Sequence, residues 1–184
     1  MNTGYQISKS AILESEDQKN QKGELIMPAS SGRSERQIQA TAAAAGRLSI
    51  RVGQLNLFAE WEADSAPGTC ELFRNLLPLK MKIIHCSWSG EGVWVQLRKW
   101  EMRWRKENET SHPKPGQLLL YPGGQSEPEL LIPCGTCIFN SRFGILKGNH
   151  FATIAEGMDD LIQLHQSLLW QGAQDCIIEK INAG

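Results

Sequence analysis

The residues best suited to chemistry lie in one short stretch, residues 85–97. His85 and Glu91 are a histidine and a carboxylate that together could take up and return a proton near neutral pH. Trp88 and Trp94 add aromatic faces of the kind that line small-ligand pockets. Because such rings and histidines are also common in satisfied cores, the alternative interpretation is that all four residues are structural.

Residues 85–97 are predicted to form a β-hairpin. Apolar residues at positions 93, 95 and 97 alternate with Trp94 and Gln96, which is the period of a strand with two unlike faces. The segment Ser89-Gly90-Glu91-Gly92 supplies the positive-φ positions that a short hairpin turn needs. The two arms would bring His85 and Glu91 close together.

His150 is the second histidine placed beside a predicted strand, and it too could act with a carboxylate as general base and acid. The other two histidines, His112 in a proline-rich loop and His165 on a helix, are expected to be structural or solvated.

Cys134 and Cys137 have the Cys-x-x-Cys spacing of redox dithiols and of half a zinc site. A thioredoxin-like pair should lie at the start of a helix, whereas both flanks here predict strands, with Gly135-Thr136 as the turn between them. No second pair completes a zinc site, so a buried or hairpin pair of thiols is expected and no metal is predicted. Five scattered cysteines indicate a reducing compartment, and we expect a cytoplasmic protein.

Composition and charge make several classes of binding partner unfavourable. The 184 residues include 19 basic and 20 acidic ones, a formal charge of -1, which gives no general attraction to nucleic acid. Tryptophans among arginines and lysines at residues 98–106 could contact nucleic acid locally, but nearby glutamates offset that charge. No apolar run is long enough for a membrane span. No phosphate-binding glycine loop is present, so no nucleotide or other cofactor is expected.

The chain divides into a polar tail and one domain. Residues 1–46 are poor in apolar residues and predict a disordered tail, and residues 47–184 predict the folded domain. Asp64-Ser65-Ala66-Pro67 is expected to cap a helix that stops at Pro78, and residues 157–171 predict a second helix. Strands are predicted at residues 48–52, 55–61, 81–88, 93–97, 117–121, 130–133, 136–139, 151–155 and 176–181. Many short strands with two helices indicate a mainly β fold, a closed or nearly closed barrel capped by helices.

Five motifs carry a resemblance to a known family: Ala66–Phe73, His85–Glu91, Leu120–Gly124, Gly148–Ile154 and Trp170–Asp175. Together they resemble an uncharacterised family of bacterial proteins with a cyclophilin-like barrel, over the whole ordered part of the chain. The resemblance implies an eight-stranded, mostly antiparallel barrel with two helices over its ends. Tyr121 and Asn149 lie within these motifs, and we include both as candidate ligand-binding residues.

Two functions follow from this resemblance. Cyclophilins isomerise X-Pro bonds with an arginine, but the corresponding hairpin here has no arginine before Leu97. The chain is also distantly similar to the catalytic domains of cucumopine and mikimopine synthases, which join histidine to a 2-oxo acid without a redox cofactor. That similarity implies that His85 or His150 moves a proton and that Glu91 orients the histidine. Trp88 and Trp94 would then hold the substrate.

Three functional hypotheses remain open at this point. The first is a small-molecule site in or at the mouth of the barrel, in an enzyme or a binding protein. The second is a non-catalytic peptide-binding module, and the third is a prolyl isomerase. Convergence of His85, Glu91 and His150 on one cavity would favour the first. Whether the chain forms a homo-oligomer is also open.

Overall fold

The computed structural model describes residues 46–97 and 105–181. Residues 1–45 of the expected tail, and residues 98–104 of the basic, tryptophan-containing segment, lie outside the described residues. The elements in chain order are β1 (Arg47–Val52), β2 (Leu55–Trp61), α2 (Pro67–Leu76), β3 (Leu79–His85), β4 (Gly90–Gln96), β5 (Glu109–Thr110), β6 (Gln117–Tyr121), β7 (Glu129–Cys137), β8 (Asn140–Ser141), β9 (Gly144–Ile145), β10 (Gly148–Glu156), α3 (Met158–Gln171) and β11 (Gln174–Ile181).

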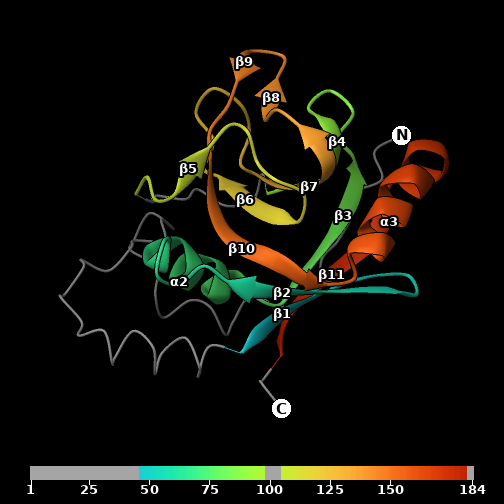
Figure 1. Ribbon diagram of the computed structural model, residues 1–184, viewed down its shortest axis with the longest axis horizontal. Coiled ribbons are helices and arrows are strands. Elements are labelled where there is room, and N and C mark those ends of the chain that lie inside the picture. Colours follow the sequence, from blue (N-terminus) through green and yellow to red (C-terminus); the bar gives the residue numbers. More distant parts are fainter. Residues whose placement is uncertain (1–45, 98–104, 182–184) are drawn as a thin grey trace, which may run out of the picture.

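Eight of the strands close into a barrel, as predicted (Figure 1). Their order is β2-β1-β11-β3-β4-β7-β6-β10, and β10 pairs back onto β2 to complete the ring. Every pairing around the ring is antiparallel. The short strand β5 adds to β10 outside the ring. Closure leaves no free edge along most of the sheet, which removes the usual route to edge-to-edge association.

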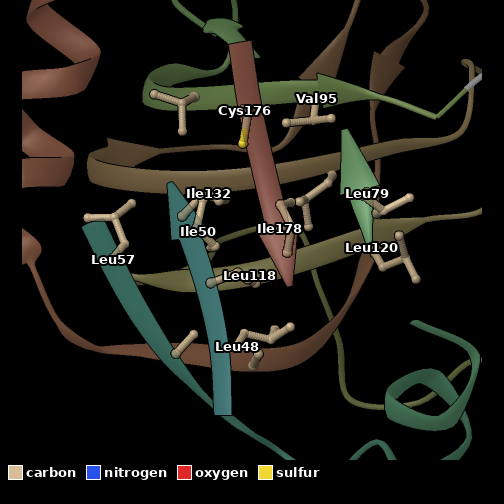
Figure 2. Packing of buried hydrophobic residues seen from close by; sticks show 14 of the residues in the cluster. Leu48, Ile50, Leu57, Leu79, Val95, Leu118, Leu120, Ile132, Cys176 and Ile178 are labelled. Atoms are coloured by element: carbon tan, nitrogen blue, oxygen red, sulfur yellow. The ribbon is translucent and has the colours of Figure 1, made fainter. Parts of the chain in front are cut away.

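The barrel interior is filled by apolar side chains from all eight strands. Figure 2 labels ten of these residues, all buried in one cluster: Leu48, Ile50, Leu57, Leu79, Val95, Leu118, Leu120, Ile132, Cys176 and Ile178. Alternate residues of each strand point inward, and eight strands enclose a space that side chains can fill. Groups available for chemistry must therefore lie on the outer face of the barrel or at its ends.

A second apolar cluster lies on the outer face of β4, β6 and β7. Residues of these strands that alternate with interior positions, such as Leu119 and Leu131, belong to it rather than to the interior. We call this set the outer cluster; its buried members are Cys86, Leu119, Tyr121, Leu131, Cys137, Phe139 and Leu146, with Trp94 packed against them. The outer cluster gives this wall of the barrel an apolar surface on both sides.

The two helices cover different parts of the barrel (Figure 1). Helix α2 packs against β10, and α3 packs against β2, β3, β4 and β7. Pro67 starts α2 as predicted, since a proline has no N–H to lose in the first turn. The expected side-chain cap from residues 64–65 is wrong: the N-cap is Ala66, and no side chain caps the helix. None of the helices in the described part of the chain is long and apolar enough to cross a membrane.

Three local predictions are also wrong. Strand β3 ends at His85 instead of residue 88, because the turn occupies residues 87–89. Gly90 has a positive φ of 116°, but Gly92 does not and lies inside β4. The two strands expected at 130–139 are largely one strand, β7, in which Gly135-Thr136 forms no turn but lies within a register shift, between Pro133 and Cys137, in the pairing with β4.

Gly90→Ala should destabilise the fold more than Gly53→Ala. Gly90 has a φ that side-chain-bearing residues rarely adopt, and an added Cβ would lie 2.4 Å from the Thr136 carbonyl oxygen. Gly53 also has a positive φ of 60°, but its added Cβ would meet no atom within 4 Å. We expect losses of roughly 3 kcal/mol and about 1 kcal/mol in the free energy of unfolding, measured with urea by circular dichroism. Equal losses would show that β4 and β7 do not approach as closely as described.

Candidate functional site

The β3–β4 hairpin positions His85 at the end of β3, next to a tight turn. The Ser89 N–H donates to the Cys86 carbonyl at 2.9 Å and the Gly90 N–H to the Ser87 carbonyl at 3.3 Å. The Ser87 hydroxyl lies 3.0 Å from Nδ1 of His85. Since the turn is held by backbone bonds, the half-buried imidazole of His85 has a fixed place at the rim of the barrel.

Three aromatic rings follow one another along this hairpin. The ring centroids of His85 and Trp88 are 6.1 Å apart, and those of Trp88 and Trp94 are 5.7 Å apart with the planes at 80°. Edge-to-face contacts of this kind favour one relative arrangement of the rings. Trp88 is 47% exposed although it is a large apolar side chain, so it offers an aromatic surface to solvent.

Behind Trp94 lies a carboxylate that sequence reasoning missed. The indole N–H of Trp94 donates to Oε2 of Glu129, which stands opposite Gln96 on the neighbouring strand β7. Glu129 is only 4% exposed. Burial raises the pKa of this carboxyl to about 7, the Trp94 hydrogen bond works against the rise, and the charge of Glu127 adds to it. The sequence signal was a lone acidic residue opening the otherwise apolar run Glu129–Ile132.

Tyr121 flanks Glu129 on the other side. It pairs with Glu129 between β6 and β7, its ring packs edge-on against Phe139 at 5.8 Å, and its hydroxyl accepts the Gln125 N–H at 3.1 Å. Gln96 donates to Glu127 at 2.8 Å on the same face. The structure therefore brings together three of the predicted residues on one outer wall, Trp88, Trp94 and Tyr121. His85 stands opposite Val93 of the interior cluster and lies at the rim of the barrel, in ring contact with Trp88.

Glu91 lies at the edge of this wall, toward α3. Its carboxylate accepts the Thr136 N–H at 2.8 Å and lies so close over Gly135 that a Cβ there would be 2.3 Å from Oε2. Its charge also acts on His165 of α3: burial lowers the pKa of His165, while Glu91 opposes that shift and His85 adds to it. Glu91 and His85 thus share their surroundings with His165, which was predicted to be structural or solvated.

His150 lies on β10, four strands from β3 in either direction around the barrel. Its Nδ1 is 3.2 Å from the side-chain nitrogens of both Asn108 and Gln117, and its Nε2 is 2.8 Å from the Thr153 hydroxyl. That hydroxyl donates to Glu62 at 2.6 Å. All of these hydrogen bonds form when Nδ1 accepts from the two amide groups and Nε2–H donates to the Thr153 hydroxyl. This is the hydrogen-bonding pattern of a neutral imidazole. Burial lowers the pKa of His150 and favours the same form.

Asn149 belongs to another network, between β10 and α2. Its side-chain nitrogen donates to the Thr69 hydroxyl at 2.9 Å and to the Arg105 carbonyl at 2.8 Å, and its Oδ1 accepts the Glu107 N–H at 3.2 Å. Glu107 in turn accepts from the N–H and the hydroxyl of Thr69. A buried amide with these partners fixes residues 105–107 against the start of α2. The hydrogen-bond networks of Asn149 and His150 therefore involve neither His85 nor Glu91.

The Cys-x-x-Cys pair is buried, but its two thiols lie on different faces of β7. Cys134 belongs to the interior cluster and Cys137 to the outer cluster. Burial raises the pKa of each thiol to about 11, the opposite of what a reactive thiolate needs. No group of three or more potential metal ligands gathers within residues 46–97 and 105–181.

Solved structures with the same fold have little sequence in common with this chain. The structure of McbB in complex with tryptophan superposes with a TM-score of 0.59 at 15% identity, over 74% of this chain and 45% of McbB. The solution structure of a hypothetical protein from Archaeoglobus fulgidus gives a TM-score of 0.50 at 17% identity, over 75% of this chain and 96% of that protein. The chain thus spans less than half the length of McbB, and these likenesses show the fold alone.

No curated protein matches the sequence. The family model described as a protein of unknown function, DUF3830, matches residues 48–179. This match runs from β1 to β11 and confirms the expected resemblance to an uncharacterised family. The chain belongs to the DUF3830 family.

Proposed function

We propose that this protein binds a small organic molecule on the outer wall formed by β4, β6 and β7, beside Trp88 and Trp94. Glu129 serves there as general acid and base in a reaction that needs proton transfer but no cofactor. The observation that carries the proposal is the burial of Glu129, a carboxyl that is 4% exposed and accepts from the Trp94 indole, and this burial raises its pKa to about 7.

A carboxyl with this pKa is suited to both directions of proton transfer. A general acid–base group works best when its pKa is close to the operating pH, so that both forms are populated. The Trp94 indole occupies Oε2, which leaves Oε1 as the oxygen for a substrate proton. A strongly shifted carboxyl beside exposed aromatic surface is typical of functional sites.

Condensation of an amine with a carbonyl compound is the reaction class that fits these groups. The amine adds to the carbonyl carbon, the hydroxyl formed there leaves as water after receiving a proton, and the nitrogen gives up a proton in exchange. Glu129 can supply the first proton and recover the second. His85, in ring contact with Trp88, is the second candidate proton carrier, and both His85 and Glu91 act on His165 of α3.

The aromatic surface points to a planar ligand. Trp88 is half exposed and fixed by Trp94, so a flat ring can stack on it with little loss of side-chain freedom. McbB, which has the same fold, was solved in complex with tryptophan. Amino acids with indole or imidazole rings, paired with 2-oxo acids, are therefore the first ligands to test. On this proposal His150 stays a structural residue, since both of its ring nitrogens are engaged.

A peptide-binding role is the second candidate, favoured by one observation. Ile138, Phe143 and Ile145 are exposed apolar residues of the segment that follows β7. This segment is tied to the residue after Trp88, because the Ile138 N–H donates to the Ser89 carbonyl at 2.8 Å. An apolar peptide could cover these side chains together with Trp88.

Thermal unfolding with added ligands should separate the two candidates. We expect tryptophan or histidine, alone or with a 2-oxo acid, to raise the melting temperature; a ligand at 100 times its Kd adds about 2.7 kcal/mol. Trp88→Ala should abolish the shift, and Trp170→Ala, which removes an 86% exposed tryptophan on α3, should leave it intact. Stabilisation by apolar peptides alone would favour the second candidate and contradict the first.

The pKa of Glu129 predicts how stability changes with pH. The folded-state pKa of about 7 lies above the ordinary value of 4.5, so the folded state binds this proton more tightly than the unfolded chain. The stability that results is fully present below pH 4.5 and is lost as the pH rises through 7. Glu129→Gln cannot ionise, so its stability relative to the parent should increase by on the order of 2 kcal/mol between pH 4.5 and 8.

Urea unfolding at several pH values measures this difference. Glu60→Gln, which changes an exposed carboxylate on β2, is the matched control and should follow the parent at every pH. A constant difference between Glu129→Gln and the parent from pH 4.5 to 8 would show that Glu129 titrates as an ordinary carboxyl, and the proposed acid–base role would fail.

A further inference from the structure

A second site is indicated by a stacked pair of side chains at the junction of β2 and α2. The guanidinium of Arg74, in the last turn of α2, lies over the ring of Trp61, the last residue of β2, with Cζ 4.5 Å from the ring centroid. Trp61 also contacts Phe73 and Phe151, with centroid distances of 6.4 and 6.2 Å. The indole is thereby fixed by the core, and the guanidinium lies over its ring.

Three hydrogen-bond donors of this pair are buried and have no acceptor. They are Nε and Nη2 of Arg74 and Nε1 of Trp61, and no described residue, in 46–97 or 105–181, accepts from them. Buried polar groups are nearly always paired, and an unpaired buried charge is among the costliest features a fold can hold. Burial lowers the pKa of Arg74, and Cys70 and Glu71 oppose that shift only in part.

The arrangement of the unpaired donors indicates which kind of ligand could bind to them. Nε and Nη2 form one edge of the guanidinium, which is the edge that grips both oxygens of a carboxylate or two oxygens of a phosphate side-on. The indole N–H adds a third donor, and the pair offers no acceptor. A ligand with several acceptor oxygens and a negative charge satisfies such a set, whereas a cation or an apolar group does not.

We propose that Arg74 and Trp61 form a binding site for an oxyanion, a carboxylate or a phosphate group. The proposal is independent of the role of Glu129, because Arg74 and Trp61 lie on α2 and β2, outside the wall formed by β4, β6 and β7. Glu71 is the carboxylate whose charge acts on Arg74. Glu62 and Glu107, which act on the neighbouring Cys70, are engaged by other donors: Glu62 accepts from Thr153, and Glu107 accepts from Thr69. Their charges, with that of Glu71, set an upper limit to affinity, so binding in the millimolar range is expected for a small anion.

Nuclear magnetic resonance of the indole N–H groups tests this site directly. The protein is labelled with ¹⁵N-tryptophan, and the Trp61 signal is identified by its loss in Trp61→Phe. Acetate, benzoate and inorganic phosphate are then added separately at constant ionic strength, with chloride as the balancing salt. We expect a saturable shift of the Trp61 signal, larger than those of the other tryptophans, and the best of the three anions identifies carboxylate or phosphate as the preferred group.

Two variants decide whether Arg74 is responsible. Arg74→Lys keeps the charge but lacks the side-on edge, and it should weaken binding at least tenfold. Arg51→Lys makes the same change at an exposed arginine on β1 and should leave the titration unchanged. Arg74→Met removes the charge, and it serves as the second test should Arg74→Lys fail to fold. A Trp61 signal that does not move with any anion, or that moves equally in the Arg74 variants, would overturn the proposal.

Discussion

Pairing between β10 and β2 is the contact on which the rest of the structure depends. It joins the two ends of the strand order into a ring. Once the ring is closed, each strand must present alternate side chains to a narrow interior, and these side chains are apolar on all eight strands. The described interior side chains therefore stabilise the fold and offer no polar groups for chemistry. Polar chemistry is confined to the outer face and to the ends, where Glu129, His150 and Arg74 are found.

Burial of polar groups distinguishes three regions of this protein. Around His150 and Asn149 every buried polar group has a partner, and these networks fix residues 105–110 to the barrel. Around Glu129 the carboxyl has one donor and a raised pKa. At Arg74 and Trp61, three buried donors (Nε and Nη2 of Arg74 and Nε1 of Trp61) have no acceptor among the described residues. Satisfied networks are typical of structural sites, whereas incomplete ones mark places where a ligand can supply what is absent.

The barrel itself could be predicted from the sequence because it depends on local patterns. Alternation at residues 48–52 and 93–97, and the helix stop at Gly172, each reflect a rule that acts over a few residues. Strand β7 was divided wrongly because Pro133 reads as a strand end; the structure accommodates it beside the register shift between Gly90 and Gly92. Strands β8 and β9, with two residues each, are too short to show a period.

The candidate site was harder to predict, since its chemistry comes from burial by distant residues. Nothing near Glu129 in the sequence shows that Trp94, 35 positions away, contacts it. Conversely, four residues from different parts of the chain engage His150, which looks free in the sequence. Gly135 shows how such contacts constrain sequence change among relatives. Because glycine has no side chain, the position leaves space for the carboxylate of Glu91. The residues at positions 91 and 135 are therefore coupled, and a relative that gained a side chain at 135 would have to move or lose the carboxylate at 91.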